Sequence, residues 1–179
     1  MTKAVSKFAS CICIFSLAMT CSVSVADAQN PIVINQTKKK EYKVKTKEEL
    51  RRILTPIQYD VTQNAGTERS FQNEYWDNKK DGQYNCRCCG YPLFSSKSKY
   101  KSGTGWPSFY NPLNKNSVGF TKDTKLTYTR VEVHCKNCKA HLGHVFDDGP
   151  KPTGKRYCMN SASMVFVDEK KMSSSQKQR

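Results

Sequence analysis

Hydrophobic and polar positions in this chain of 179 residues mostly follow short, strand-like patterns. Residues 126–134 alternate β-branched and polar side chains, which predicts a strand with one buried face. The apolar run at residues 164–167 predicts a closing strand that is buried on both sides. Gly, Ser, Pro and Asn interrupt the pattern elsewhere, as in residues 102–116, and mark turns. The fold class is therefore predicted to be mainly β.

A helical pattern is confined to the segment before residue 60. Thr46 followed by Glu49 has the spacing of a capping box, and apolar residues then recur on one face. Pro56 is expected to end this helix. Residues 57–71 contain a turn-rich connection. The sequence thus predicts short N-terminal helices followed by strands, in a chain whose length suits one domain.

The first 28 residues have the pattern of a secretory signal peptide. Lys3 and Lys7 precede an apolar run at residues 8–19, and Ala26-Asp27-Ala28 resembles a small-x-small cleavage site. The run is shorter than the roughly 20 residues of a membrane-spanning helix. A retained anchor, or a lipoprotein modified at Cys21, are the alternatives. We therefore predict a secreted or periplasmic protein that contacts a membrane only if this segment is retained.

The predicted organisation has four parts. They are a signal peptide at 1–28, a linker at 29–45, a folded domain at 46–168 and a disordered basic tail at 169–179. The formal net charge of +15 would be compatible with binding to nucleic acid. Much of this charge lies in lysine runs near the termini, so no nucleic-acid partner is expected, and the domain is expected to act as a monomer.

Two CxxC turns offer four thiolates. Cys86 and Cys89 lie in the first turn, and Cys135 and Cys138 lie in the second. Four thiolates satisfy a tetrahedral Zn²⁺ and leave no open position, so one structural zinc is predicted rather than a catalytic one. Disulfides within or between the turns are the alternative, because an exported protein would normally form them. Cys88, inside the first turn, has no assigned role.

Residues 134–163 hold all three histidines of the chain and an unpaired Cys158. A nucleophilic thiol must be a thiolate when it attacks, and Arg156 two residues earlier would favour ionisation. His141, His144 and Asn160 come from the same window. The alternative is a buried structural cysteine. The sequence therefore makes Cys158 a candidate nucleophile.

A third element is the segment Ser-Gly-Thr-Gly-Trp-Pro-Ser-Phe at residues 102–109. Two glycines before Trp106 and Phe109 would let the backbone present an aromatic wall. Such a wall suits an apolar methyl or thioether group. Core packing is the alternative interpretation of the same aromatic residues.

Together these motifs resemble the methionine-R-sulfoxide reductase family, also called methionine sulfoxide reductase B. The resemblance covers roughly residues 45–168. Its most specific stretches are CRCCGYPLF at 86–94, SGTGWPSF at 102–109, CKNCKAHLGHVFDDGP at 135–150 and PTGKRYCMNSAS at 152–163. Several long motifs in the same order are far more specific than one CxxC turn.

The resemblance implies two antiparallel sheets in an open, barrel-like arrangement with a structural zinc site. It implies reduction of methionine-R-sulfoxide, mainly in oxidised proteins, through a sulfenic acid that a thioredoxin-like thiol reductant regenerates. The implied roles are nucleophile for Cys158, polar groups around the sulfur for His141, His144 and Asn160, methyl contact for Trp106, further substrate-site positions for Phe109, Asp148 and Arg156, and zinc ligands for Cys86, Cys89, Cys135 and Cys138.

One position departs from the family pattern. Many members have a resolving cysteine where this chain has Thr104, so the usual disulfide with Cys158 cannot form. Either Cys88 resolves the sulfenic acid, or an external reductant attacks it directly, which we favour. The main rival to an enzyme is a zinc-stabilised β module that binds a ligand at Trp106 without turnover.

Overall fold

The computed structural model describes residues 41–172. The predicted signal peptide and most of the predicted linker therefore lie outside the described residues, as do residues 173–179 of the predicted tail. Residues 169–172 form a helical turn rather than the start of a disordered segment. Within the described part of the chain, no helix has the length and apolar character that crossing a membrane requires.

Two short helices begin the described chain. Helix α1 (Lys47–Ile53) starts at Thr46 with the predicted capping box to Glu49. The sequence analysis predicted short N-terminal helices but did not place helix α2 (Pro56–Asn64), because it interpreted Pro56 only as a terminator. Proline also suits the first turn of a helix, where its missing N–H costs nothing. Thr55 and Gln58 form a second capping box there, so the same signature starts both helices.

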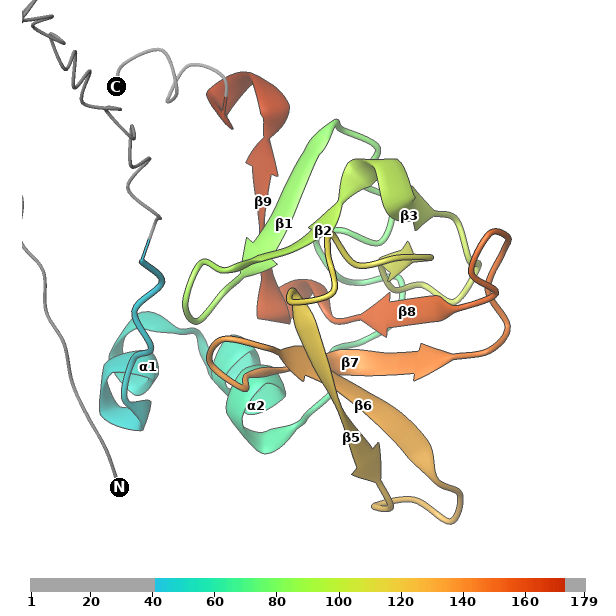
Figure 1. Ribbon diagram of the computed structural model, residues 1–179. Helices are drawn as coiled ribbons and strands as arrows, with labels where there is room; N and C mark the ends of the chain where they lie inside the picture. Colours follow the sequence, from blue (N-terminus) through green and yellow to red (C-terminus); the bar gives the residue numbers. More distant parts are fainter. Residues whose placement is uncertain (1–40, 173–179) are drawn as a thin grey trace, which may run out of the picture. The chain divides into compact units, whose positions relative to one another are not determined.

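The remaining elements form two antiparallel sheets, as predicted (Figure 1). A three-stranded sheet has the order β2-β1-β9, and a six-stranded sheet has the order β3-β4-β8-β7-β6-β5. Neither sheet closes into a barrel. The elements are β1 (Gly82–Cys86), β2 (Pro92–Ser95), η1 (Ser96–Ser98), β3 (Lys99–Tyr100), β4 (Ser108–Phe109), β5 (Val118–Asp123), β6 (Arg130–Cys135), β7 (His141–Phe146), β8 (Arg156–Met159), η2 (Ser161–Ser163) and β9 (Met164–Asp168).

Two predicted strands differ from the observed ones. Residues 126–129 belong to the turn between β5 and β6, so the strand predicted at 126–134 begins only at Arg130. Strand β9 is present, but Met164 is its one fully buried residue and the others are half-buried. Its outer position in the three-stranded sheet explains this, because it pairs with β1 alone within the described chain.

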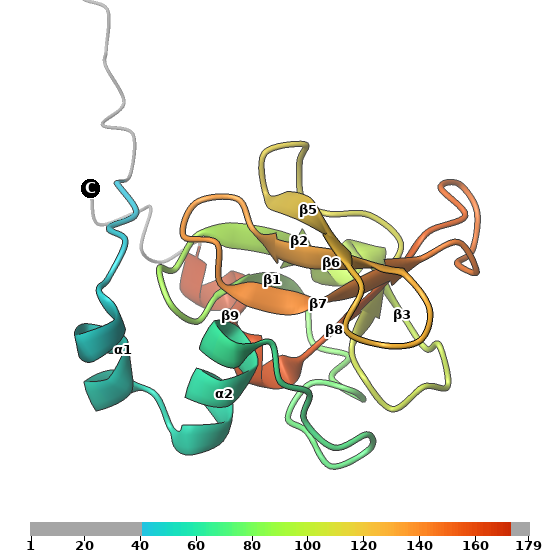
Figure 2. The same ribbon diagram turned by 90° about the horizontal axis from the view of Figure 1, so that it is seen from below.

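Aromatic side chains fill the core between the sheets. Phe94 stacks on Phe109 with ring centroids 4.4 Å apart, and Tyr84 meets Phe109 edge to face. All three rings are fully buried. Helix α2 packs beside β7 and η2 (Figure 2). The core thus holds β4, β7 and β8 in fixed positions, and these strands carry the candidate nucleophile and its neighbours.

Candidate active site and metal centre

Strand register brings the candidate catalytic residues into one cross-strand row. Cys158 on β8 lies opposite Ser108 of β4 on one side and His144 of β7 on the other. The row continues from His144 to Glu132 on β6 and from Ser108 to Tyr100 on β3. Paired residues of an antiparallel sheet project from the same face. Segments more than 50 positions apart in the chain therefore present their polar side chains together.

A pocket of about 130 Å³ opens beside Cys158. Trp106 forms part of its wall, and the indole Nε1 donates to the Glu68 carbonyl at 3.1 Å, which fixes the ring. The pocket is lined by Thr67, Trp106, Arg130, Gly143, His144, Phe146, Cys158, Met159 and Asn160. The predicted nucleophile, aromatic wall, His144 and Asn160 therefore share one small cavity.

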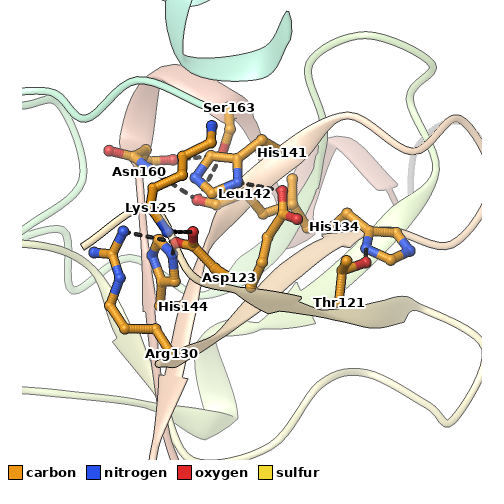
Figure 3. A network of polar contacts seen from close by, with 11 residues as sticks. Thr121, Asp123, Lys125, Arg130, His134, His141, Leu142, His144, Asn160 and Ser163 are labelled. Carbon is orange, nitrogen blue, oxygen red and sulfur yellow. Dashed lines mark hydrogen bonds and ion pairs between the residues drawn. The ribbon is translucent and has the colours of Figure 1, made fainter. Parts of the chain in front are cut away.

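His144 is held by a carboxylate. Its Nε2 lies 2.7 Å from Oδ2 of Asp123, and the Arg130 guanidinium lies 2.7 Å from the same oxygen (Figure 3). The Lys125 amide and His144 hold the pKa of Asp123 well below its usual range, so this carboxylate is ionised. Burial lowers the pKa of His144, and the hydrogen bond to Asp123 partly opposes that effect. His144 is thus oriented and close to a fixed negative charge.

His141 lies behind His144 rather than at the pocket wall. Its Nδ1 is 2.6 Å from Oε1 of Glu132, and its ring meets the His144 ring edge to face at 5.4 Å. Burial lowers the pKa of His141, and Nε2 is buried without a partner among the described residues. His141 therefore contacts the site through His144. The third histidine, His134, is directed elsewhere and hydrogen-bonds with Thr121 (Figure 3).

Asn160 and Glu68 tie the pocket floor to the chain preceding β1. The Asn160 amide donates to the Leu142 carbonyl and accepts from the Glu68 N–H. The Glu68 carboxylate accepts from the backbone amides of Ser161 and Ala162. Burial nevertheless raises the pKa of Glu68. These bonds leave Asn160 with a fixed orientation at the pocket.

Arg156 and Asp148 form a two-pronged ion pair with both contacts at 2.8 Å. The pair lowers the pKa of Asp148. The guanidinium also lies 4.4 Å over the Phe146 ring, which lines the pocket. The pair therefore supports the pocket wall and places a positive charge two residues from Cys158.

The surroundings of Cys158 act on its ionisation in opposite directions. Burial raises the pKa of the thiol, whereas the Thr104 hydroxyl and the charge of Arg156 lower it. Because burial is the larger effect, the resting group is mainly the thiol near neutral pH. The neighbouring donors are consequently needed to make the thiolate accessible.

Of the predicted substrate contacts, only Trp106 lines the pocket, whereas Asp148 and Arg156 lie behind its wall and Phe109 lies in the core. The Phe109 side chain is 0 % exposed and packs between Phe94 and Tyr84 in the core. Strand alternation explains the error, because Ser108 faces Cys158 and its neighbour must face the opposite side. The predicted role of Phe109 in substrate binding is corrected to core packing.

The four predicted metal ligands form a separate cluster. Ligand atoms of Cys86, Cys89, Cys135 and Cys138 all lie within 4.8 Å of one another. The sulfur pairs Cys86–Cys138 and Cys89–Cys135 are 3.6 and 3.7 Å apart. A disulfide requires about 2.05 Å, whereas a tetrahedral ion with bonds of about 2.3 Å places its sulfur ligands about 3.8 Å apart. The cluster therefore fits a metal ion and not a pair of disulfides.

The two CxxC turns have the same backbone design. Gly90 and Lys139 each follow the second cysteine with positive φ, 76° and 63°. Their amides donate to the carbonyls of Cys86 and Cys135 respectively. The two turns have the same shape and face each other, so each directs two sulfur atoms towards the same point.

Cys88 lies between the cluster and α2. It is 2 % exposed, and the Gln63 side chain donates to its sulfur at 3.5 Å. A thiol that is buried beside the metal ligands is poorly placed to resolve a sulfenic acid at Cys158. The Cys88 resolving role stays the less favoured alternative.

Comparison with known proteins agrees with this geometry. The SelR domain family matches residues 54–168, which is more than half of the chain. The chain belongs to the SelR family. This assignment covers the pocket, both sheets and all four clustered cysteines.

Curated relatives of this SelR protein come from animals, bacteria and plants. It is 53% identical over 122 residues to "Methionine-R-sulfoxide reductase B3, mitochondrial" of Mus musculus, with 68% of this chain and 48% of that protein covered. It is 54% identical over 121 residues to "Peptide methionine sulfoxide reductase MsrB" of Escherichia coli (strain K12 / DH10B), covering 68% and 88%. The chain spans about half the length of the mouse protein.

The Arabidopsis thaliana relative is "Peptide methionine sulfoxide reductase B1, chloroplastic". It is 47% identical over 150 residues, covering 83% of this chain and 74% of that protein.

The sequence analysis gave no role to four polar residues of the SelR site, although residues 66–68 also match the family pattern. Asp123, Arg130 and Glu132 lie on β5 and β6, and Glu68 lies in the segment after α2. Their local sequence looks like ordinary strand and loop surface. Only the pairing of β6 with β7, and of Glu68 with η2, shows that they hold His144, His141 and the pocket floor.

Proposed function

We propose that this protein reduces methionine-R-sulfoxide, mainly in oxidised proteins, to methionine through a Cys158 sulfenic acid. The observation that carries the proposal is the shared pocket of Cys158, Trp106 and His144. The names of the curated relatives support the same substrate. A thiol, an apolar wall and a proton donor are the three groups that reduction of a methyl sulfoxide needs.

The first step transfers oxygen from substrate to enzyme. The Cys158 thiolate attacks the sulfoxide sulfur and forms a sulfur–sulfur bond, while the substrate oxygen takes a proton. The hydroxyl then transfers to the Cys158 sulfur as the sulfur–sulfur bond and the substrate sulfur–oxygen bond break, which releases methionine and leaves a sulfenic acid. The sulfoxide sulfur gains two electrons and the cysteine sulfur loses two. Protonation is required because the sulfoxide oxygen leaves poorly while it is unprotonated. Two external thiols then reduce the sulfenic acid, release water and become a disulfide.

His144 is the proton donor that the geometry favours. Its Nε2 is bound to Asp123, so Nδ1 is the nitrogen that can serve the substrate. The nearby carboxylate stabilises the imidazolium that carries this proton. His141 and Glu132 act behind His144 by fixing its ring. Asn160, which is anchored on both sides, orients the substrate oxygen or a water molecule.

The epimer preference follows from a handed site. With the substrate methyl group against Trp106, only one configuration at sulfur directs oxygen towards His144. Methionine sulfoxide reductases act on one epimer each. The R epimer is the one named for the mouse relative.

The metal is proposed to be zinc, held by Cys86, Cys89, Cys135 and Cys138. Zinc with four thiolate ligands supplies structural stability and no open coordination position. It would also protect these thiolates from the oxidants that create the substrate. A thioredoxin-like protein is the proposed reductant, and export through the N-terminal segment to a secreted or periplasmic location is proposed from the sequence alone.

The decisive test uses the purified full chain with both epimers of a blocked methionine sulfoxide and dithiothreitol as reductant. We expect methionine from the R epimer, and at most background conversion of the S epimer. Binding of the R epimer without turnover would instead identify the non-catalytic β module and refute the proposal. Salt-sensitive DNA binding without reductase activity would instead support a nucleic-acid-binding function, which the net charge alone suggested.

A further inference from the structure

Three hydroxyl groups form a chain that ends at the candidate nucleophile. The Thr104 hydroxyl lies 3.9 Å from the Cys158 sulfur, at the long end of a hydrogen bond to sulfur. Ser102 lies 2.9 Å from Thr104 and 2.7 Å from Ser108. Ser108 in turn donates to the Trp106 carbonyl at 3.2 Å. All of these groups come from the glycine-rich loop and the start of β4.

The loop that presents Thr104 is anchored to the segment that follows α2. The carbonyl of Gly105 accepts from the Phe71 N–H at 2.9 Å and from the Asn73 side chain at 2.7 Å. Gly105 has φ of 83°, and a Cβ there would lie 2.7 Å from Phe71. The loop is therefore fixed close to its neighbour, and Thr104 is held near the sulfur before any substrate binds.

The row of hydroxyl groups can be oriented in two directions. A hydroxyl has one hydrogen to donate and can accept as well. With a Cys158 thiol, the order of donation is Cys158, Thr104, Ser102, Ser108 and then the Trp106 carbonyl. With a thiolate, the order reverses, so that Ser108 donates to Ser102, Ser102 to Thr104 and Thr104 to the sulfur. The first orientation satisfies the Trp106 carbonyl, whereas the reversed one gives the Ser108 hydrogen to Ser102 and withdraws it from that carbonyl, in exchange for a hydrogen bond to the ionised sulfur.

We propose that Thr104 is a catalytic hydroxyl donor to the Cys158 thiolate, and that Ser102 and Ser108 are positioning residues that reverse with it. This inference rests on the proposed nucleophilic role of Cys158 and adds residues to that reaction. Hydrogen bonds to an ionised acceptor are shorter and stronger than neutral ones. Thr104 therefore has a function of its own at the position where many relatives have a resolving cysteine.

Other charged and titratable groups also act on Cys158. Arg156 on β8 and His144 on β7 flank it, and Tyr100 on β3 lies beyond Ser108. Asp148 stands behind Arg156, while Asp123 and Arg130 stand behind His144. None of them changes when the Thr104 hydroxyl is removed. The pH dependence of the thiol therefore isolates the contribution of the hydroxyl.

The test is the pH dependence of Cys158 alkylation in the metal-loaded full chain, without substrate. Iodoacetamide labelling is followed by mass spectrometry of the tryptic peptide 157–170, in which Cys158 is the one cysteine. Thr104→Val keeps the shape of the side chain and removes the hydroxyl. We expect the midpoint of labelling to move up by about one to two pH units, the effect of one hydrogen bond to a charged group.

Two matched variants make the test specific. Thr104→Ser keeps the hydroxyl and should keep the wild-type midpoint, while Thr153→Val removes a hydroxyl that donates to the Tyr110 carbonyl and should have no effect. Ser102→Ala should raise the midpoint less than Thr104→Val, and should add nothing in the Thr104→Val background. A wild-type midpoint in correctly folded Thr104→Val would refute the proposal. Because no turnover is measured, this result is independent of whether the chain reduces sulfoxides.

Discussion

The cysteine cluster and the Cys158 pocket use the same side chain in two opposite environments. In the cluster, four sulfur atoms face one another, and two of the distances between them are 3.6 and 3.7 Å. In the pocket, a single sulfur faces a hydroxyl, an imidazole and a guanidinium. A bound metal ion would hold all four sulfurs of the first arrangement in fixed positions. The second leaves the sulfur free to take up an oxygen atom and lose it again.

The difference teaches that burial alone does not decide the chemistry of a cysteine. Burial raises the pKa of the Cys158 thiol, which by itself would make it unreactive. Reactivity depends on the donors that register places around the sulfur. Stability and catalysis are therefore assigned to different cysteines, and substitutions should separate them.

The largest expected effects come from replacing one cysteine in each region. Cys158→Ser should lower turnover by at least about a thousandfold, because serine is a far weaker nucleophile, while the thermal midpoint stays near the wild-type value. Cys135→Ser should instead lose the metal and lower the thermal midpoint by more than about 10 °C. Metal content, thermal unfolding and turnover are measured on both. Loss of stability in both variants alike would contradict the separation of the regions.

A smaller effect is expected from the carboxylate that holds His144. In the proposed mechanism the reacting form has a Cys158 thiolate, whose pKa is raised, and a His144 imidazolium, whose pKa is lowered. Activity should therefore be nearly constant at pH values between these two pKa values. At pH below the pKa of His144, activity should fall because the fraction of Cys158 thiolate decreases. At pH above the pKa of Cys158, activity should fall because the fraction of His144 imidazolium decreases.

Asp123→Asn removes the negative charge that favours the imidazolium. The pKa of His144 should fall further, so the acidic limb should move to lower pH and the plateau should drop about tenfold, the size of a modest acid-catalysis effect. Asp77→Asn, at an exposed carboxylate outside the pocket, is the control. An unchanged pH profile in Asp123→Asn would exclude His144 as the proton donor.

The smallest effect on rate is expected from a cysteine at position 104. The Thr104 oxygen is 3.9 Å from the Cys158 sulfur, so a sulfur there needs only a small loop movement to reach the 2.05 Å of a disulfide. Thr104→Cys should therefore end its first turnover as an internal disulfide, with a mass lower by two hydrogens. Wild type should gain one oxygen instead. A Cys88–Cys158 linkage in the wild type would overturn the proposal of direct reduction.

The sequence predicted the parts of the site that lie in contiguous motifs. CxxC spacing identified the four clustered cysteines, and one window identified Cys158, His144 and Asn160. The sequence analysis did not place α2, because a proline such as Pro56 can either begin a helix or end one. It also could not distinguish Ser108 from Phe109, since their opposite orientation is decided by the pairing of β4 with β8.

The roles of the supporting carboxylates could not be predicted from the sequence, and the reason is physical. Asp123 and Glu132 serve His144 and His141 only through the register of β5, β6 and β7. Register depends on packing between segments that are distant in sequence. The Thr104 contact has the same origin, because it requires the loop before β4 to return over β8.

The most direct test of the central claim is a single turnover without reductant. One equivalent of blocked methionine-R-sulfoxide is added to the reduced, metal-loaded full chain, followed by dimedone, which labels sulfenic acids. The account predicts one methionine product per chain and one dimedone adduct, on peptide 157–170 at Cys158. Product formation with the adduct on another cysteine, or with an unmodified Cys158, would contradict it.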